Sequence, residues 1–163
     1  MNDSFQKYKF FLMEKKELKV SAIQEGTVID HIPAKDLFKV IKILGLEDCK
    51  EQITFGTNLE SKKLGKKAII KIANRFFRQE EINKIALIAP DANLNIIKDY
   101  KVVEKKKVVL PDEITGIVRC YNPNCITNHE QVTTRFTVVS RKPLQLKCHY
   151  CEKITDENHI EII

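Results

Sequence analysis

Cys120-Tyr-Asn-Pro-Asn-Cys125 and, further on, Cys148-His-Tyr-Cys151 decide how the C-terminal part of this chain folds. Four residues separate the cysteines of the first pair, two separate those of the second, and 22 residues lie between the pairs. Two close cysteine pairs on tight loops can bring four thiolates to one tetrahedral Zn²⁺ ion. We therefore predict one structural zinc ion bound by Cys120, Cys125, Cys148 and Cys151.

The four cysteines have other interpretations, namely two disulfides or four unrelated thiols. Two histidines also lie nearby, His129 after the first pair and His149 inside the second, and either could replace a thiolate. Four cysteines already complete a tetrahedral site, so neither histidine is needed. A site closed by four protein ligands has no open position for water, and we expect no Lewis-acid catalysis from it.

Residues 112–163 are too few to bury a sufficient hydrophobic core alone. Residues 132–140 are rich in β-branched side chains and residues 144–147 alternate in polarity, so both stretches predict strands. Structural zinc supplies an apparent stabilisation of about 10–16 kcal/mol in small zinc peptides. We predict a small all-β zinc-binding domain over residues 112–163.

The composition is that of an ordinary globular protein. Apolar residues make up 43% of the 163 residues, enough for a packed core. The net charge of +6 favours an anionic partner: a nucleotide, a nucleic acid or an acidic protein surface. The chain starts without a signal-peptide pattern, has no run of about 18 apolar residues, and keeps Cys49 outside the zinc set. We expect a cytoplasmic protein with no membrane span.

The N-terminal part alternates strand patterns with helix patterns. Strand-like stretches cover residues 18–23, 27–29, 52–59, 67–72, 93–97 and 100–103, and helical spacing covers residues 37–44 and 80–89. We expect Gly26 to turn or bulge the chain and Asp30 to cap the helix that follows. The order predicts an α+β fold, a ferredoxin-like βαββαβ sandwich with an antiparallel sheet, two helices on one face and an added terminal hairpin.

Charge marks the boundary between the two parts. Residues 104–107 are charged and residues 108–112 are short and extended. We predict an N-terminal extension over residues 1–17, a first domain over 18–107, a linker over 108–111 and the zinc-binding domain over 112–163. The extension mixes aromatic side chains with lysines, so it either packs on its own domain or a neighbouring chain, or binds nucleic acid.

Lys67 and Lys71 lie on one face of the strand predicted over residues 67–72, because side chains alternate along a strand. Two lysines at this spacing could clamp a triphosphate. They could equally form a solvated face of the sheet, since lysine is normally exposed.

Several stretches carry a resemblance when they are taken together. They are Glu25-Gly-Thr-Val-Ile-Asp-His-Ile-Pro-Ala34, Ile53-Thr-Phe-Gly-Thr-Asn-Leu59, Leu64-Gly-Lys-Lys67, Ile70-Lys-Ile72, residues 89–95, Tyr100-Lys-Val-Val103, the first cysteine loop and Leu146-Lys-Cys-His-Tyr-Cys-Glu-Lys153. In this order they resemble the regulatory chains of aspartate carbamoyltransferase, over roughly residues 18–153.

The resemblance implies a regulatory subunit without catalytic activity. It implies a first domain that binds nucleotide effectors (CTP, ATP and possibly UTP) and a zinc domain that docks on the catalytic chain to control pyrimidine biosynthesis. It also implies a homodimer with a second regulatory chain. The residues agree with a non-enzyme, since the sequence has no nucleophile elbow and no phosphate-cradling glycine loop.

The resemblance also assigns a nucleotide site. It implies that the segment 20–23 lines the base pocket, that Asp30 meets the ribose, that His31 lies near the sugar or phosphates, and that lysines face the triphosphate and ribose. The implied site residues are Val20, Ser21, Ala22, Ile23, Asp30, His31, Lys67, Lys71, Asn95, Ile97, Tyr100, Val102 and Lys105.

On the cysteine loops, we expect Asn122, Asn124 and Glu152 to contact the catalytic chain. The rival hypothesis is a zinc-ribbon protein that binds nucleic acid, which the positive charge and the lysine-rich hairpin would fit. Strong, salt-dependent binding to DNA or RNA would separate the two, because a nucleotide sensor lacks it. We expect nucleoside triphosphates, and no nucleic acid or membrane, as partners.

Overall fold

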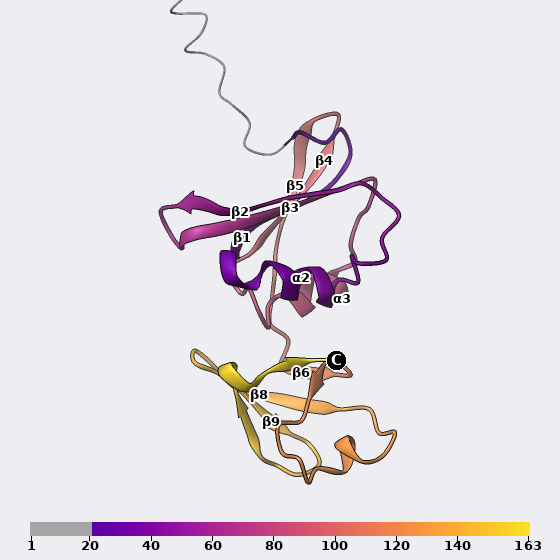
Figure 1. The fold of residues 1–163 in the computed structure, drawn as a ribbon, viewed down its shortest axis with the longest axis vertical. Coiled ribbons are helices and arrows are strands. Elements are labelled where there is room, and N and C mark those ends of the chain that lie inside the picture. The colour runs from indigo at the N-terminus through magenta and orange to yellow at the C-terminus, as the bar shows by residue number, and fades with distance from the viewer. Residues whose placement is uncertain (1–20) are drawn as a thin grey trace, which may run out of the picture.

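The computed structural model describes residues 21–163, which form two lobes, one above the other in Figure 1. The N-terminal lobe comprises β1 (Gly26–Pro33), the 3-10 helix η1 (Ala34–Asp36), α2 (Leu37–Ile43), β2 (Ile53–Ser61), β3 (Gly65–Ala73), α3 (Gln79–Ile85), β4 (Asn93–Lys98) and β5 (Lys101–Lys107). The C-terminal lobe comprises β6 (Glu113–Thr115), β7 (Val118–Arg119), η2 (Ile126–Asn128), β8 (Arg135–Arg141), β9 (Leu144–Cys148), β10 (Ile154–Asp156), η3 (Glu157–His159) and β11 (Glu161–Ile162). Across the described residues, the helices are too short or too polar to cross a membrane.

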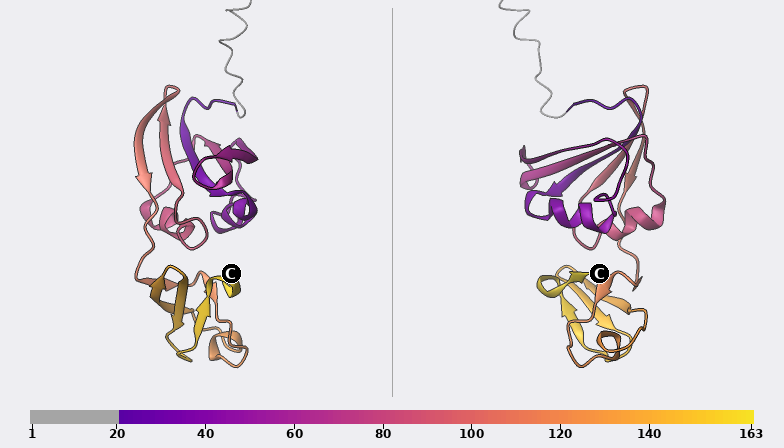
Figure 2. Two further views of the ribbon diagram at one scale, coloured as in Figure 1. Left: turned by 90° about the vertical axis from the view of Figure 1, so that its left-hand side faces the viewer. Right: turned by 45° about the vertical axis from the view of Figure 1, so that its right-hand side comes forward.

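The N-terminal lobe is built on a five-stranded antiparallel sheet in the order β2-β3-β1-β4-β5. Helices α2 and α3 lie on the same face of this sheet (Figures 1 and 2). Strand β1 lies at the centre of the sheet, between β3 and β4. This is the position that the split βαβ order gives to the first strand. The predicted α+β ferredoxin-like sandwich is therefore confirmed.

Side-chain alternation along the central strands builds the core. In β3, Ala68, Ile70 and Ile72 are fully buried, whereas Lys67 and Lys71 are only partly buried. The buried set packs with α2 and α3 in one hydrophobic cluster. Because successive side chains on a strand point to opposite faces, the two lysines lie on the sheet face away from the helices.

Gly26 begins β1 in a conformation that requires glycine. Its φ is +132°, and a Cβ placed there would lie 2.0 Å from the backbone oxygen of Ile72. The close approach follows from the register, in which Gly26 lies opposite Ala73 of β3 and Ile97 of β4. The predicted turn or bulge is thus the first residue of a central strand, where only glycine fits.

Two predictions about the start of the lobe are wrong. Residues 21–23 are not in a strand, while residues 18–20 of that predicted strand lie outside the described residues. Asp30 lies inside β1 and does not cap the helix; the residue before α2 is Asp36, which makes no side-chain cap bond. In both places a local propensity was outweighed by pairing with the central sheet, which uses residues 26–33 as its strand.

The last strand of this lobe is longer than predicted, because residues 104–107 continue the strand expected over residues 100–103. They belong to β5 and pair with β4, with Lys106 opposite Leu94 and Lys105 opposite Asn95. Charged residues suit this strand because β5 is an edge of the sheet, where lysines discourage pairing with other chains. Other bounds shift by similar amounts: α3 ends at Ile85 instead of residue 89, and β8 begins at Arg135 instead of residue 132.

The C-terminal lobe is all-β, as predicted. It holds a four-stranded sheet in the order β10-β9-β8-β6 and a two-stranded sheet of β11 and β7. Its buried centre contains Ile114, Val118, Phe136 and Leu146 together with three of the cysteines. The thiols thus form part of the packed interior of this lobe.

The two lobes share an apolar contact. Leu87, which follows α3, is buried within the cluster of the C-terminal lobe, and Leu110 packs against the cores of both lobes. A polar contact joins Lys42 Nζ of α2 to the Ile162 carbonyl of β11 at 3.5 Å. The segment after Lys107 therefore crosses between two surfaces that touch.

Candidate functional sites

The four cysteines converge on one point. All four Sγ atoms lie within 4.8 Å of one another, with Cys120 and Cys151 3.6 Å apart and Cys125 and Cys148 3.8 Å apart. A disulfide would need about 2.05 Å, so no pair of these thiols is bonded. Tetrahedral Zn–S bonds of about 2.3 Å require sulfur atoms about 3.8 Å apart. The residues fit one structural zinc ion, as predicted.

Backbone turns hold the cysteine loops in place. The N–H of Cys125 donates to the Asn122 carbonyl at 3.0 Å, and the N–H of Glu152 donates to the Cys148 carbonyl at 3.0 Å. Glu152 has a φ of +58°, which lets the second loop reverse. Asn128 adds bonds from its side-chain Nδ2 to the carbonyls of Cys120 and Asn122, at 2.9 and 2.8 Å.

Asn128 is a supporting residue that the sequence prediction did not include. The sequence marks this residue only as an amide side chain three residues after Cys125, and many loops contain an amide side chain at such a position. An amide group can donate two hydrogen bonds at once, and here both go to the first cysteine loop. Asn128 therefore fixes the loop that presents two of the zinc ligands.

The local environment affects the thiols differently. Burial raises the pKa of Cys120 and the pKa of Cys148. Burial also favours a higher pKa for Cys151. Hydrogen bonds from the Asn122 side chain and the Lys153 backbone outweigh this effect and lower the pKa of Cys151 to about 7. Buried thiolates need a compensating cation, and a bound divalent ion supplies it.

The two histidines considered as zinc ligands lie apart from the sulfur cluster. His129 Nε2 is 2.8 Å from the Pro123 carbonyl, and the His149 ring packs edge-on against Tyr150. The four-thiol cluster includes neither ring. Both have local partners instead, in agreement with a four-cysteine site.

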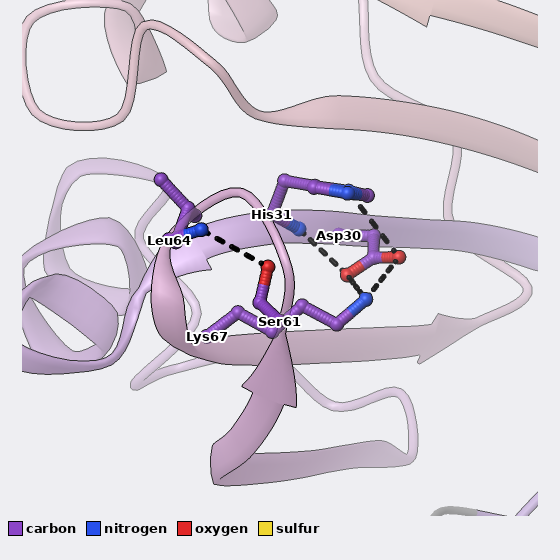
Figure 3. A network of polar contacts seen from close by, with 5 residues as sticks. All are labelled: Asp30, His31, Ser61, Leu64 and Lys67. Atoms are coloured by element: carbon purple, nitrogen blue, oxygen red, sulfur yellow. Dashed lines mark hydrogen bonds and ion pairs between the residues drawn. The ribbon is translucent and has the colours of Figure 1, made fainter.

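A polar network lies in the N-terminal lobe where β1 bulges (Figure 3). The Lys67 ammonium contacts both carboxylate oxygens of Asp30, at 2.8 and 2.9 Å. The His31 backbone N–H donates to Asp30 Oδ1 at 2.6 Å. Both side chains of the ion pair are only 20% exposed. The structure thus brings together Asp30, His31 and Lys67, three of the predicted nucleotide-site residues.

His31 owes its position to the bulge. Its φ is +62°, and the register of β1 with β3 shifts between Ile29 and Ile32. The buried Nδ1 atom of its ring lies 3.4 Å from Asp30 Oδ2 and has no hydrogen-bond partner among residues 21–163. A β-bulge re-aims the side chains beside it, and here it brings the His31 ring close to Asp30.

A second group of predicted residues crosses the sheet in one row. Lys71 of β3 is opposite Val28 of β1, Val28 is opposite Asn95 of β4, and Asn95 is opposite Lys105 of β5. Residues directly opposite in antiparallel strands share a face, so this row lies on the face away from the helices. Asp30, two residues beyond Val28, shares that face as well.

Segment 21–25 runs beside this row. Lys71 Nζ donates to the Ser21 carbonyl at 2.6 Å, and burial lowers the pKa of Lys71. The backbone N–H of Tyr100 donates to the Gln24 carbonyl at 3.0 Å, which ties the segment to the β4–β5 turn. Ala22 and Ile23 belong to the segment, and Val20 lies outside the described residues.

The remaining predicted nucleotide-site residues lie on the β4–β5 hairpin. Ile97 is buried and lies opposite Val102, whereas Val102 and Tyr100 are exposed. Tyr100 has a φ of +62° in the turn. The structure places these residues at the end of the sheet where segment 21–25 passes, and not at the Asp30–Lys67 pair.

The predicted docking residues surround the zinc site. Asn124 and Glu152 are exposed, and Asn122 is half-buried. Asn122 also supports the site, because its side chain bonds to Cys151 and accepts the Asn124 N–H at 3.3 Å. Glu152 pairs with Lys147 at 3.3 Å on the surface.

Comparisons with known proteins cover both lobes of the chain. Residues 18–109 match the family described as aspartate carbamoyltransferase regulatory chain, allosteric domain, and residues 112–161 match its metal binding domain. The aspartate carbamoyltransferase regulatory chain of Pyrococcus abyssi is 60% identical over 146 residues, which are 88% of this chain and 96% of the relative. That of Bacteroides thetaiotaomicron is 56% identical over 149 residues, covering 91% of this chain and 97% of the relative. With a four-thiol centre, an α+β sandwich and matches over nearly its whole length, this chain belongs to the family of aspartate carbamoyltransferase regulatory chains.

Proposed function

We propose that this chain is a non-catalytic subunit that binds nucleotide effectors and transmits their effect to the catalytic chain of aspartate carbamoyltransferase. The observation that carries the proposal is the face of the N-terminal sheet away from the helices. There, Lys71, Lys105 and Asn95 lie in one row, and the Asp30–Lys67 pair shares the face. Lysines and an amide side chain suit a phosphorylated ligand with a polar base and sugar.

The effectors in this proposal are CTP and ATP, with UTP as a further candidate. Lys71 and Lys105 face the triphosphate and the ribose, and Lys67 the outer phosphates. Segment 20–23 and the β4–β5 hairpin enclose the base, with Ile97, Tyr100 and Val102 as its contacts. Asp30 accepts from the ribose hydroxyls, and His31 lies near the sugar. The partial burial of Lys71 supports this role, since a desolvated ammonium gains more from an anionic partner than an exposed one does.

Regulation requires a difference in affinity between two states of the assembly. An effector shifts an equilibrium only by as much as it binds one state better than the other. We propose that the signal passes from the first domain (18–107) through the linker (108–111) to the zinc domain (112–163). The shared packing of Leu110 with both cores supports this route. Asn122, Asn124 and Glu152 then contact the catalytic chain.

Two first domains pair in this proposal to make a regulatory homodimer. Among the described residues, β2 is an edge strand of the sheet, and an edge-to-face pair of Phe38 and Phe55 is exposed there. Exposed aromatic side chains of this kind usually become contacts. The assembly is cytoplasmic, where a reducing environment keeps the zinc-binding thiols free of disulfides.

One experiment tests the whole proposal. The zinc-loaded chain is mixed with a purified catalytic trimer, association is followed by size-exclusion chromatography, and carbamoyltransferase activity is measured with CTP or ATP. We expect a stable complex whose activity responds to nucleotide. A failure to associate would contradict the proposal, and association without a response would remove the sensing role. Strong salt-dependent binding of the chain to DNA or RNA would instead favour the nucleic-acid alternative.

A further inference from the structure

A cavity of about 490 Å³ lies between the two lobes, away from both sites described above. Its walls come from η1, α2 and the segment after α3 on one side, and from the β8–β9 turn and the region of η3 on the other. A cavity of this size holds a small metabolite, and such sites often lie between domains.

Positive charge dominates the lining of the cavity. Its cations are Lys35, Lys39, Arg141 and Lys142. Its carboxylates are Asp36 and Glu157, so the lining carries an excess of two positive charges. Both carboxylates already have donors, Asp36 from Lys39 at 3.0 Å and Glu157 from the Leu144 N–H at 3.3 Å. An incoming anion would therefore meet more donors than acceptors.

Arg141 is held in position before any ligand arrives. Its guanidinium donates to the Leu110 carbonyl at 2.6 Å and to Asp112 Oδ1 at 2.5 Å. A guanidinium has five N–H donors, so these two bonds leave others for a ligand. Because Leu110 and Asp112 lie at the crossing between the lobes, this side chain is anchored to the connection itself.

Apart from Asn158, the uncharged lining is apolar, and it limits the size of the ligand. Leu87 and Leu144 are buried, and Ile88 and Leu110 are half-buried. These side chains form a surface without hydrogen-bonding groups. A compact ligand with its charges at its ends fits such a cavity better than a nucleotide with a large base.

We propose that this cavity binds a small multivalent anion, a phosphorylated or polycarboxylate metabolite, which bridges the two lobes. Lys35 and Lys39 reach it from the N-terminal lobe, and Arg141 and Lys142 reach it from the C-terminal lobe. A ligand bound to both lobes favours the state in which they are at this separation. The site is separate from the proposed nucleotide face, and its test does not depend on nucleotide binding.

The test uses pyrophosphate and citrate as probes, titrated into the full-length zinc-loaded chain by isothermal calorimetry. At least one probe should bind at millimolar concentration or tighter. The double variant K35Q/K142Q should weaken that binding by about tenfold, because two charge-assisted contacts are lost. K98Q is the matched control, since Lys98 is an exposed lysine at the β4–β5 turn, and it should change the affinity by less than about twofold.

Two results would overturn the proposal. One is the absence of binding by either probe. The other is binding that K35Q/K142Q leaves unchanged and that K71Q removes, because the probe would then occupy the sheet face. Amide chemical shifts of the unmodified chain give a check that needs no variant: Leu110 and Leu144 should move on titration, and shifts confined to other regions would also contradict the site.

Discussion

The two lobes of this chain reach stability by different means. The N-terminal lobe has a continuous aliphatic core, in which Ile29, Ile70, Ile82 and Leu94 are fully buried between a sheet and two helices. In the C-terminal lobe, three of the buried side chains are zinc-binding cysteines. Apolar burial is distributed over many contacts, whereas a metal concentrates stability in four bonds. The lobes should therefore fail under different treatments.

Removal of the metal is the most severe test of this difference. Chelation, or Cys125→Ser, should unfold the C-terminal lobe, since structural zinc contributes about 10 kcal/mol or more in small zinc domains. Circular dichroism should lose part of its strand signal, and zinc analysis should fall from one ion per chain to none. Cys49→Ser is the control and should keep the metal. A C-terminal lobe that stays folded without zinc would show that the site is not structural.

Deletion of core side chains tests the comparison from the other side. Ile29→Ala should cost the N-terminal lobe about 2–5 kcal/mol, because Ile29 is fully buried and leaves a cavity. Hydrogen exchange resolved by lobe should show faster exchange in β1 and β3, with one zinc ion still bound. Ile114→Ala is the matched change in the C-terminal lobe. If Ile29→Ala released zinc, the two lobes would not be separable in this way.

Nucleotide binding should follow the N-terminal lobe alone. Lys71→Ala should weaken the binding of nucleoside triphosphates by about tenfold, since one charge-assisted contact is lost, and should affect nucleosides less. Calorimetry with CTP and with cytidine measures both. Lys153→Ala is the control, because Lys153 is an exposed lysine of the C-terminal lobe. An equal loss for both ligands would count against a phosphate contact. Loss of CTP binding on chelation of the zinc would show that nucleotide binding depends on the C-terminal lobe as well.

The smallest expected effect is a pH dependence on the surface of the C-terminal lobe. A hydrogen bond from His159 lowers the pKa of Asp156. A lowered carboxyl pKa contributes stability that is present above the ordinary value of about 3.9 and is lost as the pH falls through the folded value. Asp156→Asn should therefore lower the melting temperature slightly at pH 5, and the difference from the unmodified chain should shrink as the pH falls toward the folded pKa. A difference that stays constant over this range would point to lost geometry instead of lost charge.

The sequence was sufficient where a pattern depends on local periodicity. The alternation along residues 67–72 put Lys67 and Lys71 on one face, and the structure buries the opposite face. The cysteine spacing identified all four zinc ligands. The sequence-based prediction failed where pairing with a distant strand determines the position of a residue. Nothing near Asp30 shows that Lys67, 37 residues away, pairs with it, so a capping role was the better local prediction.

The contact between the lobes could not have been predicted for the same reason. Leu87 falls within the helix predicted over residues 80–89, yet it lies beyond the end of α3 and is buried in the cluster of the other lobe. Lys105 lies beyond the strand predicted over residues 100–103, yet β5 pairs it with Asn95. Both residues depend on how separate elements come together. The nucleotide-site assignment, the docking residues and the boundaries of the domains remain predictions.

The position of the chain end has a practical consequence. β11 pairs with β7, the Ile163 N–H donates to the Ile117 carbonyl, and Lys42 of the other lobe contacts the Ile162 carbonyl. The C-terminus consequently lies on the side of its lobe that faces the other one (Figure 1). A fluorophore attached there, with an acceptor on α2, would report directly on the separation of the lobes. An affinity tag at the same end would lie between the lobes and alter the contact between them.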